Sequence, residues 1–208
     1  MWSIINFISL LVSLFLFSYF YILSVQPKTR EESISVDPNK AWKQCYYFRI
    51  IAMIFETLLT VNAILWYWFP IEGWNSQIFQ RLWRSQLTGG LIIVLGGIIM
   101  LKGMKDAGSE SAKPSQETEM YGGIYNYIRH PQSLGEFPIF PALGLMVNSM
   151  ILFIILTAYI IIYLPIMIHY EEQDLLKRFG DPYLEYKEGT GALFPKWDTI
   201  RNWFGLKK

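Results

Sequence analysis

Long runs of apolar residues alternate with short polar stretches along the chain. Residues 4–25 include no charged residue, and residues 48–69 form a second run that is interrupted by Glu56 and Asn62. Residues 87–101 form a third run, which is shorter and rich in glycine. The hydrocarbon core of a bilayer is about 30 Å thick and an α-helix rises about 1.5 Å per residue, so roughly 20 apolar residues span it. The pattern therefore predicts three membrane-spanning helices in the first half of the chain.

The second half holds two more apolar runs, residues 137–147 and 150–168, which are separated by Asn148 and Ser149. So short a connection forces the two helices to pack antiparallel as neighbours. The helical pattern continues beyond the last run as far as Gly180, where a glycine stop is expected. We therefore predict an all-α integral membrane protein with about five transmembrane helices. The last two form a tight hairpin, and a cytosolic helical tail follows.

The composition of the chain agrees with a membrane protein and excludes several other classes. Of the 208 residues, 52% are hydrophobic and 17% are charged, which is too apolar for an ordinary soluble domain. The formal net charge of +1 provides no overall field to attract nucleic acid, so no nucleic-acid partner is expected. The single cysteine, Cys45, excludes an internal disulfide. Cys and His residues show no metal-ligand spacing, and no metal is expected.

Basic residues are distributed unevenly between the predicted loops. Of the 18 Lys and Arg residues, all but Arg81 and Arg84 fall on one side of the predicted membrane. Cytoplasmic loops carry an excess of Lys and Arg. We therefore expect a multi-pass protein whose amino terminus lies outside the membrane. The polar segment 102–129 and the carboxyl terminus are expected in the cytosol.

Residues 122–136, at the start of the fourth predicted helix, form the densest cluster of unusual residues. In the simplest interpretation, Arg129 and His130 are ordinary anchors at the membrane interface. The predicted hairpin, however, brings the start of the fourth helix to the same membrane face as the end of the fifth. Glu171 and Glu172 lie at that end. The convergence of a histidine with two carboxylates predicts a functional site.

A series of motifs runs through the second half of the chain. In chain order they are Gly123-Ile124-Tyr125, Arg129-His130-Pro131-Gln132-Ser133-Leu134-Gly135, Glu171-Glu172, Phe179-Gly180-Asp181-Pro182-Tyr183-Leu184-Glu185-Tyr186 and Leu193-Phe194-Pro195-Lys196. Each motif alone is a weak signal, but the series together is specific. Its order and spacing resemble the membrane methyltransferases related to isoprenylcysteine carboxyl methyltransferase and the phospholipid methyltransferases. The earlier part of the chain resembles the family only in its predicted spans.

This resemblance implies a methyltransferase that uses S-adenosyl-L-methionine and acts on a lipid or lipidated acceptor entering from the bilayer. A zwitterionic sulfonium cofactor suits a pocket that has a carboxylate and an aromatic wall. By resemblance, Glu171 holds the amino group of the cofactor, and Tyr125 lines the pocket together with Met120. The resemblance also assigns the methionine end of the cofactor to four consecutive residues, His130, Pro131, Gln132 and Ser133.

Departures from the family pattern leave the class of acceptor open. Isoprenylcysteine methyltransferases carry two arginines for the substrate carboxylate at places where this chain has Met167 and Ala192, so a bidentate clamp is missing. A carboxylate acceptor needs no base, whereas an amine or hydroxyl that carries a proton does. Glu172 and His169 are the candidate catalytic residues for that step, with Glu136 as a third possibility. Phospholipid N-methylation is therefore the alternative to an isoprenylcysteine-like reaction.

The motifs divide the chain into two parts. Residues 1–101 are predicted to form three transmembrane helices. Residues 102–208 are predicted to form the methyltransferase core, with a polar loop, the transmembrane hairpin and a cytosolic cofactor-binding tail.

Two interpretations from other classes stay open: a membrane reductase of the sterol type, and a non-catalytic helix bundle that retains the pocket. Oxidation of NADPH with a sterol would favour the first, and cofactor binding without methyl transfer would favour the second.

Overall fold

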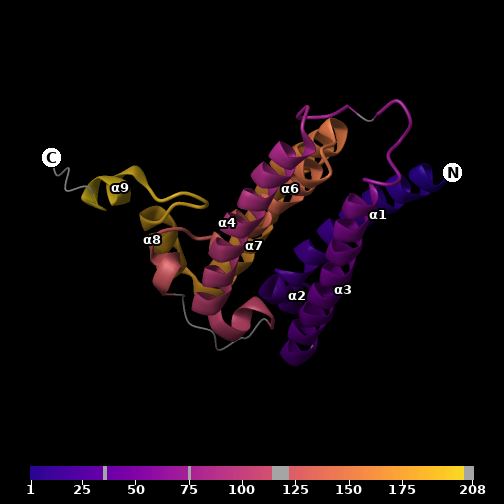
Figure 1. Ribbon diagram of the computed structural model, residues 1–208. Coiled ribbons are helices and arrows are strands. Elements are labelled where there is room, and N and C mark those ends of the chain that lie inside the picture. Colours follow the sequence, from indigo (N-terminus) through magenta and orange to yellow (C-terminus); the bar gives the residue numbers. More distant parts are fainter. Residues whose placement is uncertain (35–36, 75, 114–121, 204–208) are drawn as a thin grey trace.

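The computed structural model describes residues 1–34, 37–74, 76–113 and 122–203, and within these ranges the chain is built from helices (Figure 1). Four helices are long and apolar enough to cross a membrane. They are α1 (Trp2–Ser24), α3 (Pro38–Leu65), α4 (Leu82–Ala107) and α7 (Met150–Phe179). The predicted all-α class with membrane-spanning helices agrees with this architecture.

Local capping fixes both ends of α7. The Ser149 side chain accepts a hydrogen bond from the Leu152 amide at the start of the helix, as serine at an N-cap commonly does. The helix ends before Gly180, whose φ of 63° is a conformation that favours glycine. The predicted glycine stop is confirmed, and α8 (Asp181–Gly189) begins directly after it.

The fourth predicted span, residues 137–147, corresponds to a single short helix, α6 (Ile139–Met146). A separate helix, α5 (Pro131–Glu136), precedes it, and the two are separated at Phe137 and Pro138. Proline lacks an amide hydrogen and its ring collides with the preceding turn, so it interrupts the helix. Neither piece is long enough to cross a bilayer alone. The described residues therefore contain four long candidate spans, where the sequence predicts about five.

The helices pack in two groups that share one core (Figure 1). In the first group α1 lies beside α3, and the short helix α2 (Pro27–Ile34) connects them. In the second group α4 packs on α5 and α6, and α6 packs on α7. Phe17 of α1 joins the groups, because its ring lies 5.9 Å from the rings of both Phe140 and Tyr163. Contacts of this kind between aromatic rings stabilise the core beyond simple burial.

Three glycines of α4 allow its backbone to approach α5 and α6 closely. Gly89, Gly96 and Gly103 recur every seven residues, which is close to two helical turns, so they share one face. A Cβ atom at Gly96 would collide with the carbonyl oxygen of Gly135 in α5. One at Gly103 would lie 2.9 Å from the side chain of Gln132. We call this face the glycine seam, and it fixes the start of α5 against α4.

Contacts at the two ends of the bundle show how the chain runs back and forth. At the end that we call the turn end, Asn148 Oδ1 accepts hydrogen bonds from the amides of residues 78–79. At the opposite end, which we call the motif end, the Asp174 carboxylate accepts a hydrogen bond of 2.7 Å from the Thr29 amide. Helices α4 and α7 both run from the turn end to the motif end. The pair α5 and α6 returns in the other direction.

Candidate active site

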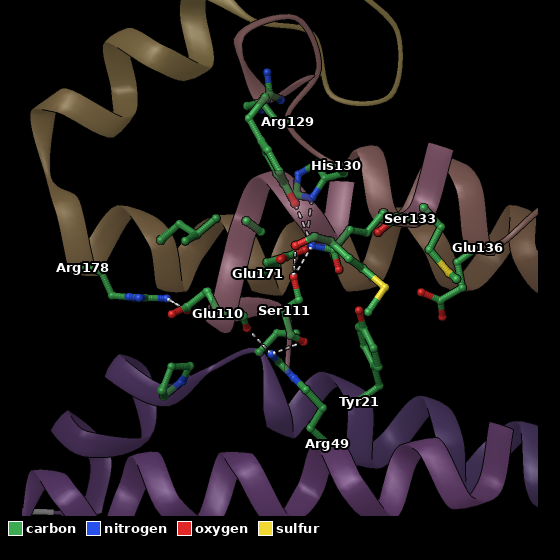
Figure 2. Close-up of a pocket in the computed structure, with 18 of the residues that line it drawn as sticks. Tyr21, Arg49, Glu110, Ser111, Arg129, His130, Ser133, Glu136, Glu171 and Arg178 are labelled. Atoms are coloured by element: carbon green, nitrogen blue, oxygen red, sulfur yellow. Dashed lines mark hydrogen bonds and ion pairs between the residues drawn. The ribbon is translucent and has the colours of Figure 1, made fainter. Parts of the chain in front are cut away.

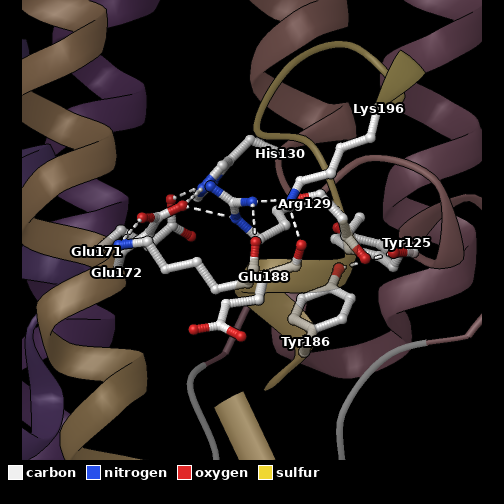
Figure 3. A network of polar contacts seen from close by, with 10 residues as sticks. Tyr125, Arg129, His130, Glu171, Glu172, Tyr186, Glu188 and Lys196 are labelled. Atoms are coloured by element: carbon white, nitrogen blue, oxygen red, sulfur yellow. Dashed lines mark hydrogen bonds and ion pairs between the residues drawn. The ribbon is translucent and has the colours of Figure 1, made fainter. Parts of the chain in front are cut away.

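The motifs that the sequence predicts to converge do meet, at the motif end of the bundle (Figure 3). His130 immediately precedes α5, and its ring lies against two carboxylates near the end of α7. Nδ1 is 3.1 Å from Oε2 of Glu171, and Nε2 is 3.0 Å from Oε1 of Glu172. Because adjacent carboxylates engage both ring nitrogens, the imidazole is held in one orientation.

The charge of His130 follows from these surroundings. The residue is only 4% exposed, and burial by itself lowers the pKa of an imidazole. The carboxylates of Glu171 and Glu172 more than offset that effect and raise the pKa of His130 to about 9. An imidazolium donates from both nitrogens, which matches the two contacts. His130 is therefore a cation at neutral pH.

Glu172 is surrounded by cations. Its Oε1 accepts a hydrogen bond of 2.8 Å from Arg129 Nε, and its Oε2 lies 2.8 Å from Lys187 Nζ. With His130, three cationic side chains compensate the charge of one buried carboxylate. Such compensation is what makes burial of an ion tolerable. Glu172 thereby holds the Arg129-His130 motif, α7 and α8 together.

The tail fixes the backbone of the same motif. The amides of Arg129 and His130 donate to the carbonyl oxygens of Gly191 and Ala192 at 2.8 and 2.9 Å. A side chain at Gly191 would collide with the carbonyl group of Phe194. The segment after α8 therefore sets the conformation of the residues that lead into α5, and it needs glycine to do so.

A cavity of about 290 Å³ opens beside this cluster, between the two helix groups (Figure 2). One wall carries charged side chains from the motifs, and the opposite wall comes from α1 and α3. The rest of the lining is largely apolar or aromatic and includes Met53, Met100, Met104, Tyr125, Tyr183 and Tyr186. Apolar walls with a few convergent polar groups are typical of sites that bind small molecules.

Hydrogen bonds fix the aromatic part of the lining. The Gln132 side chain donates to the Tyr125 hydroxyl at 2.8 Å and to Ser111 Oγ at 3.2 Å. The Tyr186 hydroxyl donates to the backbone carbonyl of Tyr125 at 2.7 Å. Burial raises the pKa of Tyr186 to about 12, so its phenol is neutral at physiological pH. These contacts hold both rings rigidly at the cavity.

Most of the residues predicted to bind the cofactor line this cavity. Tyr125, His130, Gln132, Ser133 and Glu171 all contribute to its wall. They come from three separate stretches of chain, namely the turn before the motif, the start of α5 and the end of α7. The structure therefore brings these five together, and their roles toward a cofactor stay predictions.

The other predicted site residues lie elsewhere. Pro131 is buried in the first turn of α5, against Gly103 of the glycine seam. His169 is exposed on α7, where its Nε2 is 2.9 Å from the Gln173 side chain. It lines, with Glu172, a second groove that is mainly apolar. Met120 lies outside the described residues.

Three charged residues at the cavity were not identified from the sequence. Arg49 of α3 donates through Nη1 to the carbonyl oxygens of Glu110 and Ser111, at 2.8 and 3.1 Å. Arg178 forms an ion pair of 3.0 Å with the Glu110 carboxylate, and both side chains are 8% exposed. Arg178 follows Glu171 by seven residues, or about two turns, so helical spacing on its own could have predicted its position. Arg49 has no comparable signal, because it begins an apolar run.

Two further carboxylates line the cavity, Glu56 of α3 and Glu136 of α5. They come from different helix groups. The sequence marks Glu56 only as a charge in an apolar run, and its place at the cavity depends on how the two helix groups pack together.

Comparison with known proteins supports the family resemblance. Residues 84–182 match the model of the phospholipid methyltransferase family. The chain is 29% identical over 153 residues to methanethiol S-methyltransferase of Pseudomonas deceptionensis, covering 68% of this chain and 57% of the relative. It is 35% identical over 139 residues to methanethiol S-methyltransferase 1 of Bradyrhizobium diazoefficiens, covering 67% and 41%. It is 27% identical over 206 residues to protein-S-isoprenylcysteine O-methyltransferase of Saccharomyces cerevisiae, covering 91% and 79%.

No solved structure matches the chain significantly. The chain spans 57% and 41% of the lengths of the two methanethiol S-methyltransferases. The family match extends from α4 into the start of α8, and so includes the Arg129-His130-Pro131 motif and the Glu171-Glu172 pair. These matches confirm the resemblance: residues 84–182 are homologous to the membrane methyltransferases of the phospholipid methyltransferase family.

Proposed function

We propose that the chain is an integral membrane methyltransferase that uses S-adenosyl-L-methionine to methylate a lipid or lipidated acceptor. The observation that carries the proposal is the contact of His130 with Glu171 at the wall of a cavity lined by methionine and tyrosine side chains. The relatives support the same reaction type, since those compared above are named as methyltransferases.

The cavity fits this cofactor chemically. A ligand with an ammonium group suits the Glu171 carboxylate, which is 30% exposed and belongs to the lining. A ligand with a carboxylate and hydroxyl groups suits a site whose wall has hydrogen-bond donors that no protein acceptor uses. Arg49 Nε and the Tyr183 hydroxyl are buried without a hydrogen-bond partner among the described residues, and both residues line the cavity. Buried polar atoms are normally satisfied, so such atoms favour a polar ligand nearby.

The residues of the chain act by binding, orienting and excluding water. The bound cofactor supplies an electrophilic methyl group on a sulfonium. Glu171 holds the ammonium end and is itself oriented by His130, while His130, Gln132 and Ser133 surround the methionine end. Pro131 does not line the cavity and acts by starting α5 between them. Tyr125 provides an apolar wall, and Met120 is assigned to the same pocket. Methyl transfer depends mainly on such positioning and on a dry site.

The proposed membrane arrangement has five crossings. We infer that α5 and α6 together complete the crossing for which each is too short, and that α6 and α7 form the tight hairpin. The turn end then lies outside with the amino terminus, and the motif end lies in the cytosol with the tail. A cysteine introduced at exposed Trp74 should react with an impermeant maleimide from outside, and one at Lys187 should not. The reverse labelling would contradict this orientation.

The two parts of the chain contribute differently to the proposed site. Residues 102–208 supply the motifs and the cofactor-binding tail. Residues 1–101 supply spans and, through Tyr21 and Arg49, one wall of the cavity. Both parts are therefore needed for the proposed activity.

The proposed acceptor is a lipid or lipidated molecule that enters from the bilayer, with a phospholipid amine as the alternative. The isoprenylcysteine relative supports a lipidated acceptor. The names of the other relatives add a thiol to the possible reacting groups.

Cofactor binding provides the test. Isothermal titration of the purified protein with S-adenosylhomocysteine should show binding that Glu171→Gln and His130→Gln each weaken by about tenfold or more, since a charge-assisted contact contributes roughly 1.5–3 kcal/mol. Glu72→Gln, an exposed glutamate between α3 and α4, is the matched control and should bind normally. Unaltered binding in both site variants would contradict the proposed site.

A further inference from the structure

One short segment at the cavity is held by both helix groups. The 3-10 helix η1 (Gly108–Ser111) follows α4, and its residues Glu110 and Ser111 belong to the cavity lining. Arg49 of α3 donates through Nη1 to the backbone carbonyl oxygens of both residues, at 2.8 and 3.1 Å. From the other group, Arg178 of α7 forms its ion pair of 3.0 Å with the Glu110 carboxylate. Figure 2 shows both arginines converging on this segment.

Hydrogen bonds also connect η1 to the aromatic wall of the cavity. The Gln132 side chain donates to Ser111 Oγ at 3.2 Å and to the Tyr125 hydroxyl at 2.8 Å. Ser111 Oγ in turn donates to the Met104 carbonyl oxygen at 3.1 Å. A chain of polar contacts therefore runs from Arg49 to Tyr125, a residue predicted to bind the cofactor. Members of such chains support one another, so losing one contact weakens the others.

The cavity is nearly closed around the predicted cofactor residues. Tyr125, His130 and Ser133 are each no more than 5% exposed. The cavity volume of about 290 Å³ lies at the lower limit of the roughly 300–1,000 Å³ that sites for small molecules occupy. A ligand as large as the proposed cofactor therefore needs a neighbouring segment to move before it can reach these side chains.

Gly108 gives η1 a point at which to move. Its φ of 63° is a conformation that favours glycine. A Cβ atom added there would meet no atom of the described residues within 4 Å, so the space beside this joint is open. The contacts that hold η1 therefore lie at its far end, at Glu110 and Ser111.

We propose that Arg49 is a positioning residue of the site: it holds η1 closed over the cofactor cavity, and the cofactor enters and leaves when this contact opens. This inference rests on the proposed methyltransferase function and adds a control of ligand exchange to it. Arg49 lies outside residues 84–182, which carry the family match. The first helix group thereby controls access to motifs that belong to the second.

The chemistry of arginine suits this role. Arg49 binds two backbone carbonyl oxygens, so it fixes the position of η1 independently of the side chains that η1 carries. A guanidinium presents several donors in a fixed plane, whereas a lysine ammonium is a single charge on a flexible stem. Arg178 supports the closed position from the other side, and its guanidinium also lies 4.9 Å from the Trp42 ring of α3. Lysine at position 49 should therefore hold η1 less firmly than arginine but better than glutamine.

A first experiment measures access to the cavity without any cofactor. In a Cys45→Ala background, Ser133→Cys places a single thiol on the cavity wall, and its rate of reaction with a methanethiosulfonate reagent follows the open fraction of the protein. Arg49→Gln should raise this rate about tenfold or more, because it removes hydrogen bonds from a charged donor. Arg49→Lys should raise it less, and the exposed control Arg84→Gln should leave it unchanged. A thiol at exposed Ser33 should react equally fast in all of these variants.

The native cysteine separates opening of η1 from general loosening of the fold. Cys45 is fully buried in α3, so in the single variant Arg49→Gln it should react as slowly as in wild type. An unchanged rate at position 133 in Arg49→Gln would overturn the proposal. Equal acceleration at Cys45 and at position 133 would overturn it as well, because it would show a purely structural role.

A second experiment follows exchange of S-adenosylhomocysteine by stopped flow. Arg49→Gln should raise both the association and the dissociation rate about tenfold, since a conformational step that precedes binding slows both. Glu171→Gln, which removes a proposed ligand contact, should raise mainly the dissociation rate. An unchanged association rate in Arg49→Gln would overturn the proposal. Failure of the wild type to bind this ligand would instead overturn the proposed function, and the labelling experiment would still decide the role of Arg49.

Discussion

The protonation of His130 predicts a specific dependence of stability on pH. The pKa of the buried imidazole rises from an ordinary value of 6.5 to about 9 in the folded protein. Because the folded pKa is raised, the stabilisation is fully present below pH 6.5 and is lost as the pH rises through about 9. Each pKa step corresponds to about 1.4 kcal/mol, so the total is about 3 kcal/mol. The residue is only 4% exposed, and solvent screening therefore reduces this value little.

Thermal unfolding in detergent micelles, followed by tryptophan fluorescence, measures this effect. The wild type should be about 3 kcal/mol more stable than His130→Gln near pH 6, and the difference should largely vanish near pH 9.5. For a chain of this length the expected difference in Tm at the lower pH is roughly 6–12 °C. His169→Gln removes the other, exposed histidine and is the matched control, which should show no such trend.

Nuclear magnetic resonance tests the cause directly. In the His169→Gln variant, labelled with ¹⁵N at histidine, the ring nitrogens of His130 give a single set of signals. These signals should report an imidazolium at pH 7 and titrate near pH 9. A midpoint at or below 6.5 would refute the argument that Glu171 and Glu172 outweigh the burial of the ring.

Three further changes test the packing around the site, each by thermal or denaturant unfolding in micelles. Gly96→Ala should lower the free energy of unfolding by about 1–3 kcal/mol, because the added Cβ would collide with the backbone of Gly135. The neighbouring change Gly97→Ala, where the added Cβ meets no described atom within 4 Å, should be neutral or slightly stabilising. Equal effects of the two changes would contradict close packing of α4 on α5 at the glycine seam. Glu110→Gln should cost about 3–5 kcal/mol because it removes the carboxylate that forms a buried ion pair with Arg178, and a loss below 1 kcal/mol would show that the pair is effectively solvated. Asn148→Ala should cost about 1–3 kcal/mol, since the Asn148 side chain accepts two backbone hydrogen bonds at the turn end, and an unchanged Tm would argue against that contact.

Elements that depend on local sequence were predictable. The apolar runs gave the long helices, and the glycine stop after α7 was predicted at Gly180, where the structure has it. The convergence of His130 with Glu171 was also predictable, because a hairpin brings its two open ends to one place. The apolar run at residues 137–147 shows a limit of this reasoning: it predicts a full span, whereas the structure has the short helix α6 there, separated from α5 at Pro138.

Elements that depend on packing between distant helices were not predictable from one sequence. The place of Glu56 at the cavity requires α3 to pack against the second helix group, where it contacts α6, and no spacing in the chain specifies that neighbour. Arg49 likewise reads as the polar start of an apolar run. Its role at the cavity emerges only when the short 3-10 helix Gly108–Ser111 packs over it.

The two faces of α4 place opposite constraints on substitution. On the glycine seam, a single methyl group added at Gly96 would collide with the backbone of α5. The expected loss of stability is therefore steric and does not depend on the polarity of the new side chain. On the outward face, Leu91, Val94 and Ile98 are more than half exposed, and their requirement is only to be apolar. Random mutagenesis of this one helix should therefore yield a tolerance pattern with a period of seven residues. The positions that do not tolerate substitution would identify the residues of α4 against which the start of α5, with its Arg129-His130-Pro131 motif, is packed.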